Sequence, residues 1–280
     1  MPRLMGCFKY ITIAALCSGF ITLGLVGDPA APTKIYWTEY GANKVRSCEL
    51  ANCTPINLAV IPNTAPVGIA LDGNGKIYWT EWATSKIRFC EIASCTPTTL
   101  TSTGKLPSSI ALDGAGKIYW SESNGAKIRF CEIAACTPIN LTSTEDYPYN
   151  IALDGKGKIY WAQHKEAKID FCEIANCVIT VLTTGEITPA GVALDGQGKI
   201  YWTSYGKNLI RFCEIASCTP TTLTQTGLNP TEITLDGAGK VYWAEEGTDK
   251  IRFCVIDGCT PTDFFTSTQG AVTTGVVLGN

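Results

Sequence analysis

The chain has 280 residues, a formal net charge of −3 and 17% charged side chains, with 14 cysteines and a single histidine. Its mild acidity excludes the basic surface that nucleic-acid-binding proteins use, and one histidine excludes metal centres built from several imidazoles. The number of cysteines indicates either an oxidising compartment or a metal-rich protein.

The first 27 residues differ from the rest of the chain. Arg3 and Lys9 precede an apolar run, 11–27, which ends at Asp28 and Pro29. A basic segment before a short apolar one is typical of a secretory signal peptide, and this run is short for a membrane span. We expect 1–27 to be a signal peptide, or an anchor if it is retained, and 28–33 to be a linker. The protein would then be secreted, periplasmic or at the cell surface.

Residues 34–280 contain one unit repeated six times. Lys-Ile-Tyr-Trp begins at Lys34 and recurs every 41 or 42 residues, the last time as Lys-Val-Tyr-Trp at Lys240. A period near 40 is typical of propeller blades or of helical solenoids. Each unit has four short segments rich in β-branched and aromatic residues between Gly, Pro or Asx turns, which favours strands. The pattern predicts an all-β protein, a six-bladed β-propeller with four antiparallel strands per blade.

The two ends of the repeat array predict how the ring closes. The array begins at Lys34 with the second strand of a unit, and 274–280 resembles the first strand at 67–73. The C-terminal strand is therefore expected to be the innermost strand of the blade formed by 34–61. This 1+3 closure leaves no incomplete terminal blade.

Within each unit, two cysteines flank the turn between the third and fourth predicted strands, in the pattern Cys-x4-Cys. Facing residues of an antiparallel ladder have Cα atoms about 4.5–5.5 Å apart, which is within disulfide range. The alternatives are free thiols or metal, although two thiolates are only half of a tetrahedral zinc site. We predict six intrablade disulfides: Cys48–Cys53, Cys90–Cys95, Cys131–Cys136, Cys172–Cys177, Cys213–Cys218 and Cys254–Cys259.

The turns at one end of the strands hardly vary between units. The first and second strands are joined by Asp-Gly-x-Gly, as at 72–75, and this turn lies on the same face of the ring as the cysteine turn. Asp-Gly followed by a second glycine is hairpin chemistry that needs positive φ. We call this the turn face, interpret it as scaffold, and interpret its aspartates as turn caps rather than metal ligands.

The opposite face, which we call the loop face, varies from unit to unit. It carries the loops between second and third strands and the starts of the innermost strands, and loops on a rigid scaffold commonly carry binding sites. Aromatic side chains among carboxylates suit a peptide or a carbohydrate, and the acids favour a cationic partner. The candidate binding residues are Tyr40, Glu81, Trp82, Glu122, Tyr149, Asn150, His164, Tyr205, Glu232 and Glu245, with Glu145, Asp146 and Tyr147 nearby.

The Tyr-Trp-Thr-Glu motif and the Pro-x-x-Ile-Ala-Leu-Asp-Gly segment before it resemble the YWTD repeats of low-density-lipoprotein-receptor class B propellers, over 34–280. The resemblance implies the same fold and a structural role for the acid of the motif. It leaves Glu39, Glu81, Glu122 and Glu245 with a structural alternative to binding. The family's aspartate is replaced here by those four residues and by Gln163 and Ser204.

Other repeated residues are assigned to the interior. We expect the Ile, Tyr and Trp of each motif to pack between blades, and Tyr40 and Trp82 have partial burial as an alternative to ligand contact. The arginine that recurs in five units, as Arg88 does, is expected to bond a carboxylate of a neighbouring blade. The fourth unit has Asp170 at that position.

Two classes of function follow. The first is an exported, monomeric, non-enzymatic binding or scaffold propeller, without cofactor, metal or catalytic residues. It would recognise an extracellular protein, peptide or carbohydrate, and a membrane only if the N-terminal segment is retained. The alternative is a metal-dependent hydrolase or lyase of the lactonase type. Such a site needs several oxygen ligands converging on the axis, where the first strands offer Asn150 and Glu232.

Overall fold

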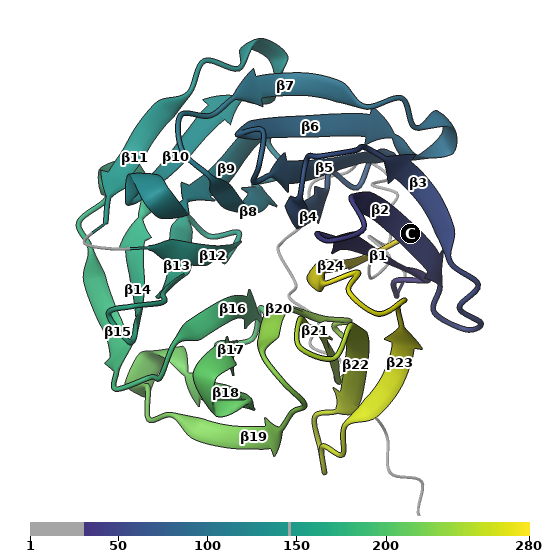
Figure 1. Cartoon of the computed structure of the whole chain (residues 1–280). Helices are drawn as coiled ribbons and strands as arrows, with labels where there is room; N and C mark the ends of the chain where they lie inside the picture. Colours follow the sequence, from purple (N-terminus) through teal and green to yellow (C-terminus); the bar gives the residue numbers. More distant parts are fainter. Residues whose placement is uncertain (1–30, 145–146) are drawn as a thin grey trace, which may run out of the picture. The chain divides into compact units, whose positions relative to one another are not determined.

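The computed structural model describes residues 31–144 and 147–280. The expected signal peptide at 1–27, and Glu145 and Asp146 of the loop face, lie outside the described residues. The described part contains 24 strands in six separate four-stranded sheets, and it contains no α-helix. The sheets surround one axis as the blades of a propeller (Figure 1). The predicted six-bladed β-propeller is confirmed. No helix in these two ranges is long and apolar enough to cross a bilayer.

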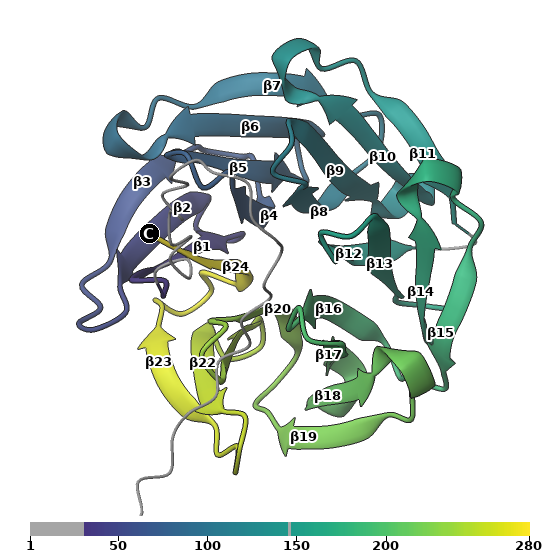
Figure 2. The same cartoon turned by 180° about the vertical axis from the view of Figure 1, so that it is seen from behind.

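Each blade is an antiparallel meander that runs outward from the axis, which Figure 2 shows from behind. The innermost strands are β4 (Pro66–Leu71), β8 (Pro107–Leu112), β12 (Pro148–Leu153), β16 (Pro189–Leu194), β20 (Pro230–Leu235) and β24 (Thr273–Gly279). The motif strands are β1 (Lys34–Glu39), β5 (Lys76–Glu81), β9 (Lys117–Glu122), β13 (Lys158–Gln163), β17 (Lys199–Ser204) and β21 (Lys240–Glu245). The third strands are β2 (Lys44–Glu49), β6 (Lys86–Glu91), β10 (Lys127–Glu132), β14 (Lys168–Glu173), β18 (Leu209–Glu214) and β22 (Lys250–Val255). The outermost strands are β3 (Ile56–Val60), β7 (Thr98–Ser102), β11 (Ile139–Ser143), β15 (Thr180–Thr184), β19 (Thr221–Gln225) and β23 (Thr262–Thr266).

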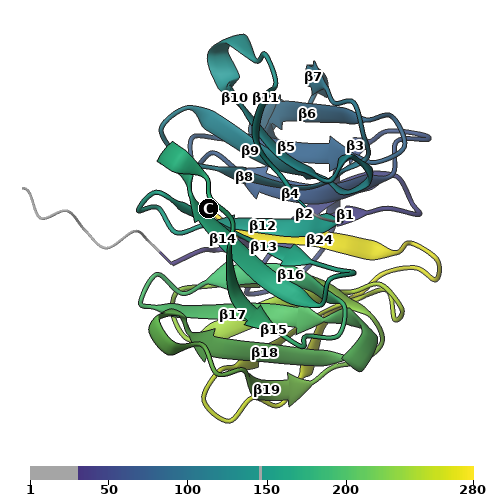
Figure 3. The same cartoon turned by 90° about the vertical axis from the view of Figure 1, so that its left-hand side faces the viewer.

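The last strand closes the ring as expected. β24 pairs antiparallel with β1, with Ile35 opposite Leu278, and the first blade has the order β24-β1-β2-β3. In the side view of Figure 3, β24 is the yellow strand. Because the pairing joins the two ends of the array, no blade lacks a strand. The 1+3 closure is therefore confirmed.

The core lies between neighbouring blades. Successive side chains of a strand point to opposite faces, so the Tyr of a motif faces away from the Ile and Trp of the same strand. Tyr36 of the first blade thus packs with Ile77 and Trp79 of the second. The same arrangement passes around the ring until Tyr242 packs with Trp37. All six motif tryptophans are 0% exposed. The predicted packing of the motif between blades is confirmed.

The turn face has the two devices that its repeated residues predicted. All six predicted disulfides form, with Cα atoms 4.9 to 5.1 Å apart. In four blades the cysteine turn contains a short 3-10 helix: η1 (Ile92–Ser94), η3 (Ile133–Ala135), η4 (Ile174–Asn176) and η6 (Ile215–Ser217). In the Asp-Gly turns the aspartate caps the hairpin, since Asp72 Oδ1 accepts from the N–H groups of Asn74 and Lys76.

Candidate functional site

The acids of the motifs lie beneath the loop face. Glu81 is 0% exposed and accepts hydrogen bonds from Trp79 Nε1, at 3.3 Å, and from the hydroxyl of Thr84. Arg88 of the adjacent strand lies 2.9 Å from the same carboxylate. The side chains of Trp79 and Glu81 meet because residues two apart share one face of a strand. Glu81 therefore holds its loop and neutralises a half-buried arginine.

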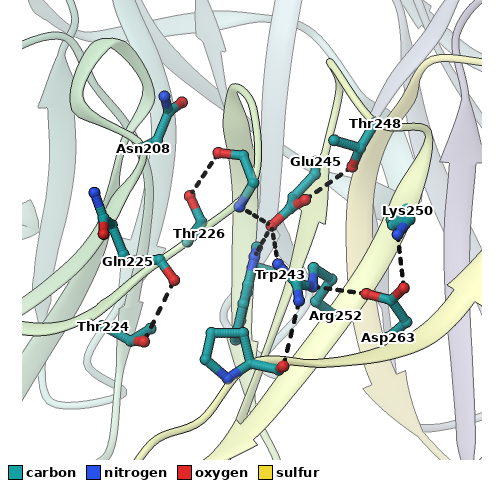
Figure 4. Close-up of polar contacts among 12 residues, drawn as sticks. Asn208, Thr224, Gln225, Thr226, Trp243, Glu245, Thr248, Lys250, Arg252 and Asp263 are labelled. Atoms are coloured by element: carbon teal, nitrogen blue, oxygen red, sulfur yellow. Dashed lines mark hydrogen bonds and ion pairs between the residues drawn. The ribbon is translucent and has the colours of Figure 1, made fainter.

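The sixth blade shows the same arrangement in full (Figure 4). Glu245 accepts from Trp243 Nε1 at 2.9 Å, from the Gly227 N–H at 2.8 Å and from the Thr248 hydroxyl at 2.8 Å. Arg252 lies 3.6 Å from it. Glu39 and Glu122 are equally buried and are bonded to the Trp and Arg of their own blades. Three of the candidate binding residues, Glu81, Glu122 and Glu245, thus lie in the interior and serve the scaffold.

The partners of the repeated arginines differ from the expected ones. In the first, second, third and sixth blades the Arg–Glu pair joins two strands of one blade, and the expected pair between two blades is wrong. The reason is that the motif strand pairs with the third strand of its own blade, which places the arginine directly opposite the motif tryptophan, as Arg46 is opposite Trp37. In the fifth blade Ser204 replaces the acid, and Glu186 from the preceding connection bonds Trp202 Nε1 at 2.9 Å and Arg211 at 2.7 Å. The sequence signal for this replacement is that Glu186 lies three residues before Pro189, the first residue of the innermost strand.

Nearer the axis, the innermost strands bulge. The pairing between innermost and motif strands shifts register in every blade. In four blades the backbone N–H at the bulge donates to the hydroxyl of the residue directly after the motif tryptophan. These bonds run from Gly68 to Thr80, Ser109 to Ser121, Gly191 to Thr203 and Gly275 to Thr38. The fourth and sixth motifs have Ala162 and Ala244 instead, and their bulge residues are Asn150 and Glu232.

The bulges form a narrow neck. A Cβ on Gly191 would lie 2.3 Å from Thr231 O, and one on Gly275 would lie 2.2 Å from Val67 O. Glycine is required at these two positions because the innermost strands of neighbouring blades converge there. The cavity left on the axis is about 10 Å³. It has room for about one water molecule.

Asn150 and Glu232 close this neck by bonding to each other. Asn150 Nδ2 donates to Glu232 Oε1 at 3.0 Å and lies equally close to Ser109 Oγ. Asn150 Oδ1 accepts from the Val192 N–H, and Glu232 Oε2 accepts from the Val276 N–H. The bridge therefore ties together five of the six blades. Glu232 is partly buried among protein atoms of the neck, and this burial raises the pKa of its carboxyl to about 8, although the two hydrogen bonds act to lower it.

Above the neck, one residue per blade stands at an equivalent position, directly after the motif. In each blade its backbone N–H donates to a carbonyl of the connection that enters the blade, at 2.9 to 3.2 Å. The backbone is thus held in the same way six times, whatever the side chain. These residues are Tyr40, Trp82, Ser123, His164, Tyr205 and Glu246. Two of the loops contain a 3-10 helix, η2 (Ser123–Gly125) and η5 (Tyr205–Lys207).

Five of these six, together with Tyr149 of β12, form what we call the mouth cluster: Tyr40, Trp82, Tyr149, His164, Tyr205 and Glu246. The ring of Tyr149 stacks on His164 at 5.3 Å, and His164 meets the edge of Tyr205 at 5.7 Å. Tyr40 and Trp82 form an edge-on pair at 6.1 Å, and Trp82 is 37% exposed. His164 Nδ1 lies 3.2 Å from Pro189 O, so its N–H can donate there.

Charge in the mouth cluster is concentrated on Glu246. Tyr205 hydrogen-bonds this carboxylate, and burial raises the pKa of Glu246 in spite of that bond. The pKa of Tyr149 is raised far above its usual value by burial first and then by the nearby charge of Glu246. Of the two adjacent glutamates at the end of β21 and the start of the loop, the sequence pattern selected Glu245, which is buried at the end of the strand, and missed Glu246. The equivalence of Glu246 with Tyr40 and Trp82 is the signal that identifies it.

The predicted candidates thus fall into three groups. Tyr40, Trp82, Tyr149, His164 and Tyr205 come together at the mouth. Asn150 and Glu232 lie below it in the neck. Glu81, Glu122 and Glu245 are interior. In the described ranges no group of three or more His, Cys, Asp and Glu side chains is placed to hold a metal ion.

No family model matches the sequence, and no curated protein matches it. The fold is similar to that of a chain in a nidogen–laminin complex, with a TM-score of 0.80 and 19% identity over 88% of this chain and 98% of that one. It is also similar to virginiamycin B lyase from Staphylococcus aureus, with a TM-score of 0.65 and 18% identity over 90% of each chain. A streptogramin B lyase gives a TM-score of 0.67 and 18% identity over 86% of this chain and 82% of that one. At such identities the likeness shows the propeller fold alone.

Proposed function

We propose that this chain is an exported, non-enzymatic binding propeller that recognises a protein partner through the mouth cluster. The observation that carries the proposal is the contrast at the six equivalent positions after the motif. Their backbones make the same hydrogen bond, yet their side chains are Tyr, Trp, Ser, His, Tyr and Glu. A scaffold that holds the backbone in the same way whatever the side chain allows the side chains at these positions to differ and to form a binding surface.

Two further observations support a protein partner outside the cell. The fold is similar to that of a chain in a nidogen–laminin complex, which is an assembly of two proteins. The chain has six disulfides, and disulfides form and persist mainly in oxidising compartments. Export would deliver the chain to such a compartment.

The chemistry of the mouth favours a basic segment of the partner. Aromatic faces attract cations by about 0.5–2 kcal/mol, and Glu246 adds a carboxylate next to Tyr205. Tyr149 and the Asn150–Glu232 bridge form a floor, because the axial cavity beneath is only about 10 Å³. A Lys or Arg side chain on a surface loop could reach this floor, and the body of the partner would rest on Tyr40 and Trp82.

The test selects linear peptides from a displayed random library on the immobilised full chain. We expect enrichment of peptides with Lys or Arg beside an apolar residue. Trp82→Ala and Glu246→Gln should each weaken the selected peptides about tenfold or more. Val255→Ala, an exposed change on the turn face, is the matched control and should leave binding unchanged. Equal binding by wild type, Trp82→Ala and Glu246→Gln would reject the mouth cluster as the site.

A lyase is the second candidate, favoured by the likeness to two lyases and by the place of the chain's one histidine. His164 contacts both Tyr149 and Tyr205 at the mouth. The test incubates the purified chain with virginiamycin B, with and without Mg²⁺, and follows the antibiotic by mass spectrometry. Our first proposal predicts no conversion above a protein-free control. If the chain converts virginiamycin B and His164→Ala abolishes this conversion, the proposal of a non-enzymatic binding protein is wrong and the chain is a lyase.

A further inference from the structure

Three hollows of the described residues lie on the turn face, between neighbouring blades. The groove between the third and fourth blades has a volume of about 610 Å³, and the groove between the fourth and fifth about 510 Å³. A third, between the fifth and sixth blades, measures about 390 Å³. Small-molecule sites commonly have volumes of about 300–1,000 Å³. The face that the repeats mark as scaffold therefore has room for ligands.

The two larger grooves have the same lining. In the groove between the fourth and fifth blades, Asp154, Lys158 and Tyr160 form one wall, and Leu194, Glu214 and Ile215 form the other. The groove between the third and fourth blades has Asp113, Lys117 and Tyr119 opposite Leu153, Glu173 and Ile174. Each groove thus combines apolar side chains with carboxylates, an ammonium group and a phenol.

The polar groups are placed to bond a ligand. The ring of Tyr160 is buried between blades, and this tyrosine lines the groove. Glu214 pairs with Lys199 at 3.6 Å, and both side chains remain well exposed, at 57% and 38%. Such an exposed pair is held weakly, so both heads can turn to a ligand.

We propose that these two grooves bind saccharide units, so that the chain carries at least two equivalent glycan sites on its turn face. A sugar ring has an apolar face, which fits Leu194 and Ile215, and a rim of hydroxyls, which need both donors and acceptors. The groove supplies acceptors at Glu214 and a donor at Lys199. Repetition on one rigid face would raise the avidity for a polysaccharide without any new contact. This inference is independent of the mouth cluster, which lies on the other face.

The sixth blade provides a natural control. Val255, 51% exposed, stands where the fourth and fifth blades have Glu173 and Glu214. The groove that Val255 lines is also the smallest of the three. We therefore expect this groove to bind sugars least well. Glu214→Val and Val255→Glu each introduce a residue that another blade already has at the same position, so we expect both variants to fold.

The test first exposes the full chain to an array of neutral and acidic oligosaccharides. The best-bound oligosaccharide is then titrated into chain labelled at its isoleucine methyl groups. We expect dissociation constants on the order of 1 mM per site and shifts at Ile174 and Ile215. Glu214→Val should weaken the response of Ile215 about tenfold and leave that of Ile174 unchanged. Val255→Glu should create a new response at Ile256, which lines the third groove.

Three results would overturn the proposal. The first is an array on which no oligosaccharide is retained. The second is binding whose methyl shifts avoid Ile174 and Ile215. The third is Glu214→Val binding as the wild type does at Ile215, with its spectrum showing the native fold. Trp82→Ala is the cross-control, since it should weaken peptide binding at the mouth about tenfold or more and leave the sugar titration unchanged.

Discussion

The two faces of this propeller obey different rules. On the turn face, side chains hold the backbone: the aspartate caps a hairpin and the cysteines close a turn, so the same residues recur. On the loop face, the residue after each motif is held by its own N–H, and its side chain differs from blade to blade. Repetition therefore marks side chains that the fold needs, and variation marks positions where the fold needs only backbone.

The largest expected effect compares two acids that are both near the loop face. Glu81→Ala would leave Arg88 and Trp79 Nε1 without their partner, and breaking such an interior ion pair costs about 3–5 kcal/mol. Glu246→Ala at the mouth should cost less than about 1 kcal/mol. Denaturant unfolding followed by tryptophan fluorescence measures both. Equal losses of stability would break the distinction between scaffold acid and mouth acid.

The next effect concerns the turn face alone. Replacing Cys90 and Cys95 together by serine removes a short closed loop, for which the chain-entropy model gives about 2 kcal/mol of lost stability. The same double replacement at Cys213 and Cys218 should cost the same within about 0.5 kcal/mol, because the two turns are alike. Guanidinium unfolding of both variants checks this. A large difference between the blades would show that the repeats are not equivalent.

A pH effect is expected from the neck. The folded chain holds a proton on Glu232 up to a pKa of about 8, whereas the unfolded chain releases it near 4.5. Its contribution to stability is thus present in full below pH 4.5 and is lost as the pH rises to 8, with a slope of at most about 1.4 kcal/mol per pH unit. Glu232→Gln should remove most of this slope.

The control for the pH effect is Glu246→Gln. Burial also raises the pKa of Glu246, so this variant should remove a smaller part of the slope. Free energies of unfolding across that pH range decide the matter. A wild type whose stability rises over the same range would contradict the assignment of a protonated Glu232.

The smallest effect belongs to the exposed aromatic residue. Trp82→Ala removes an edge-on contact with Tyr40 and should change the free energy of unfolding by less than about 0.5 kcal/mol. Trp79→Ala, three residues earlier in the same blade, should cost about 3–5 kcal/mol. Thermal melts of the two variants make the comparison. A loss of several kcal/mol in the free energy of unfolding of Trp82→Ala would show that Trp82 belongs to the scaffold and not to the binding surface.

Much of the fold could be predicted from the sequence because each blade repeats the same local chemistry. The period, the closure by β24 and the disulfides all depend on residues close in sequence or on the repeat itself. The partners of the repeated arginines were predicted wrongly, as neighbouring blades, because strand pairing within a blade brings Arg and Trp face to face.

The site was harder to predict, since contacts across the axis leave no local pattern. Asn150 and Glu232 are 82 residues apart, and only the ring brings their side chains together. Glu186 was missed because it acts on Trp202 from a connection and not from the motif. A sequence signal for the neck does exist. The two blades whose motif has alanine in place of Thr or Ser also have a large polar residue at the bulge, as the blade of Ala162 has Asn150.

Hydrogen–deuterium exchange of the full chain with a selected basic peptide tests most directly whether the loop face is the binding face. We predict slower exchange in the loops after Tyr40, Trp82 and Tyr205, and no change in the Asp-Gly turns at 72–75 and 195–198. Protection confined to those turns, with the loops around the mouth unchanged, would contradict it.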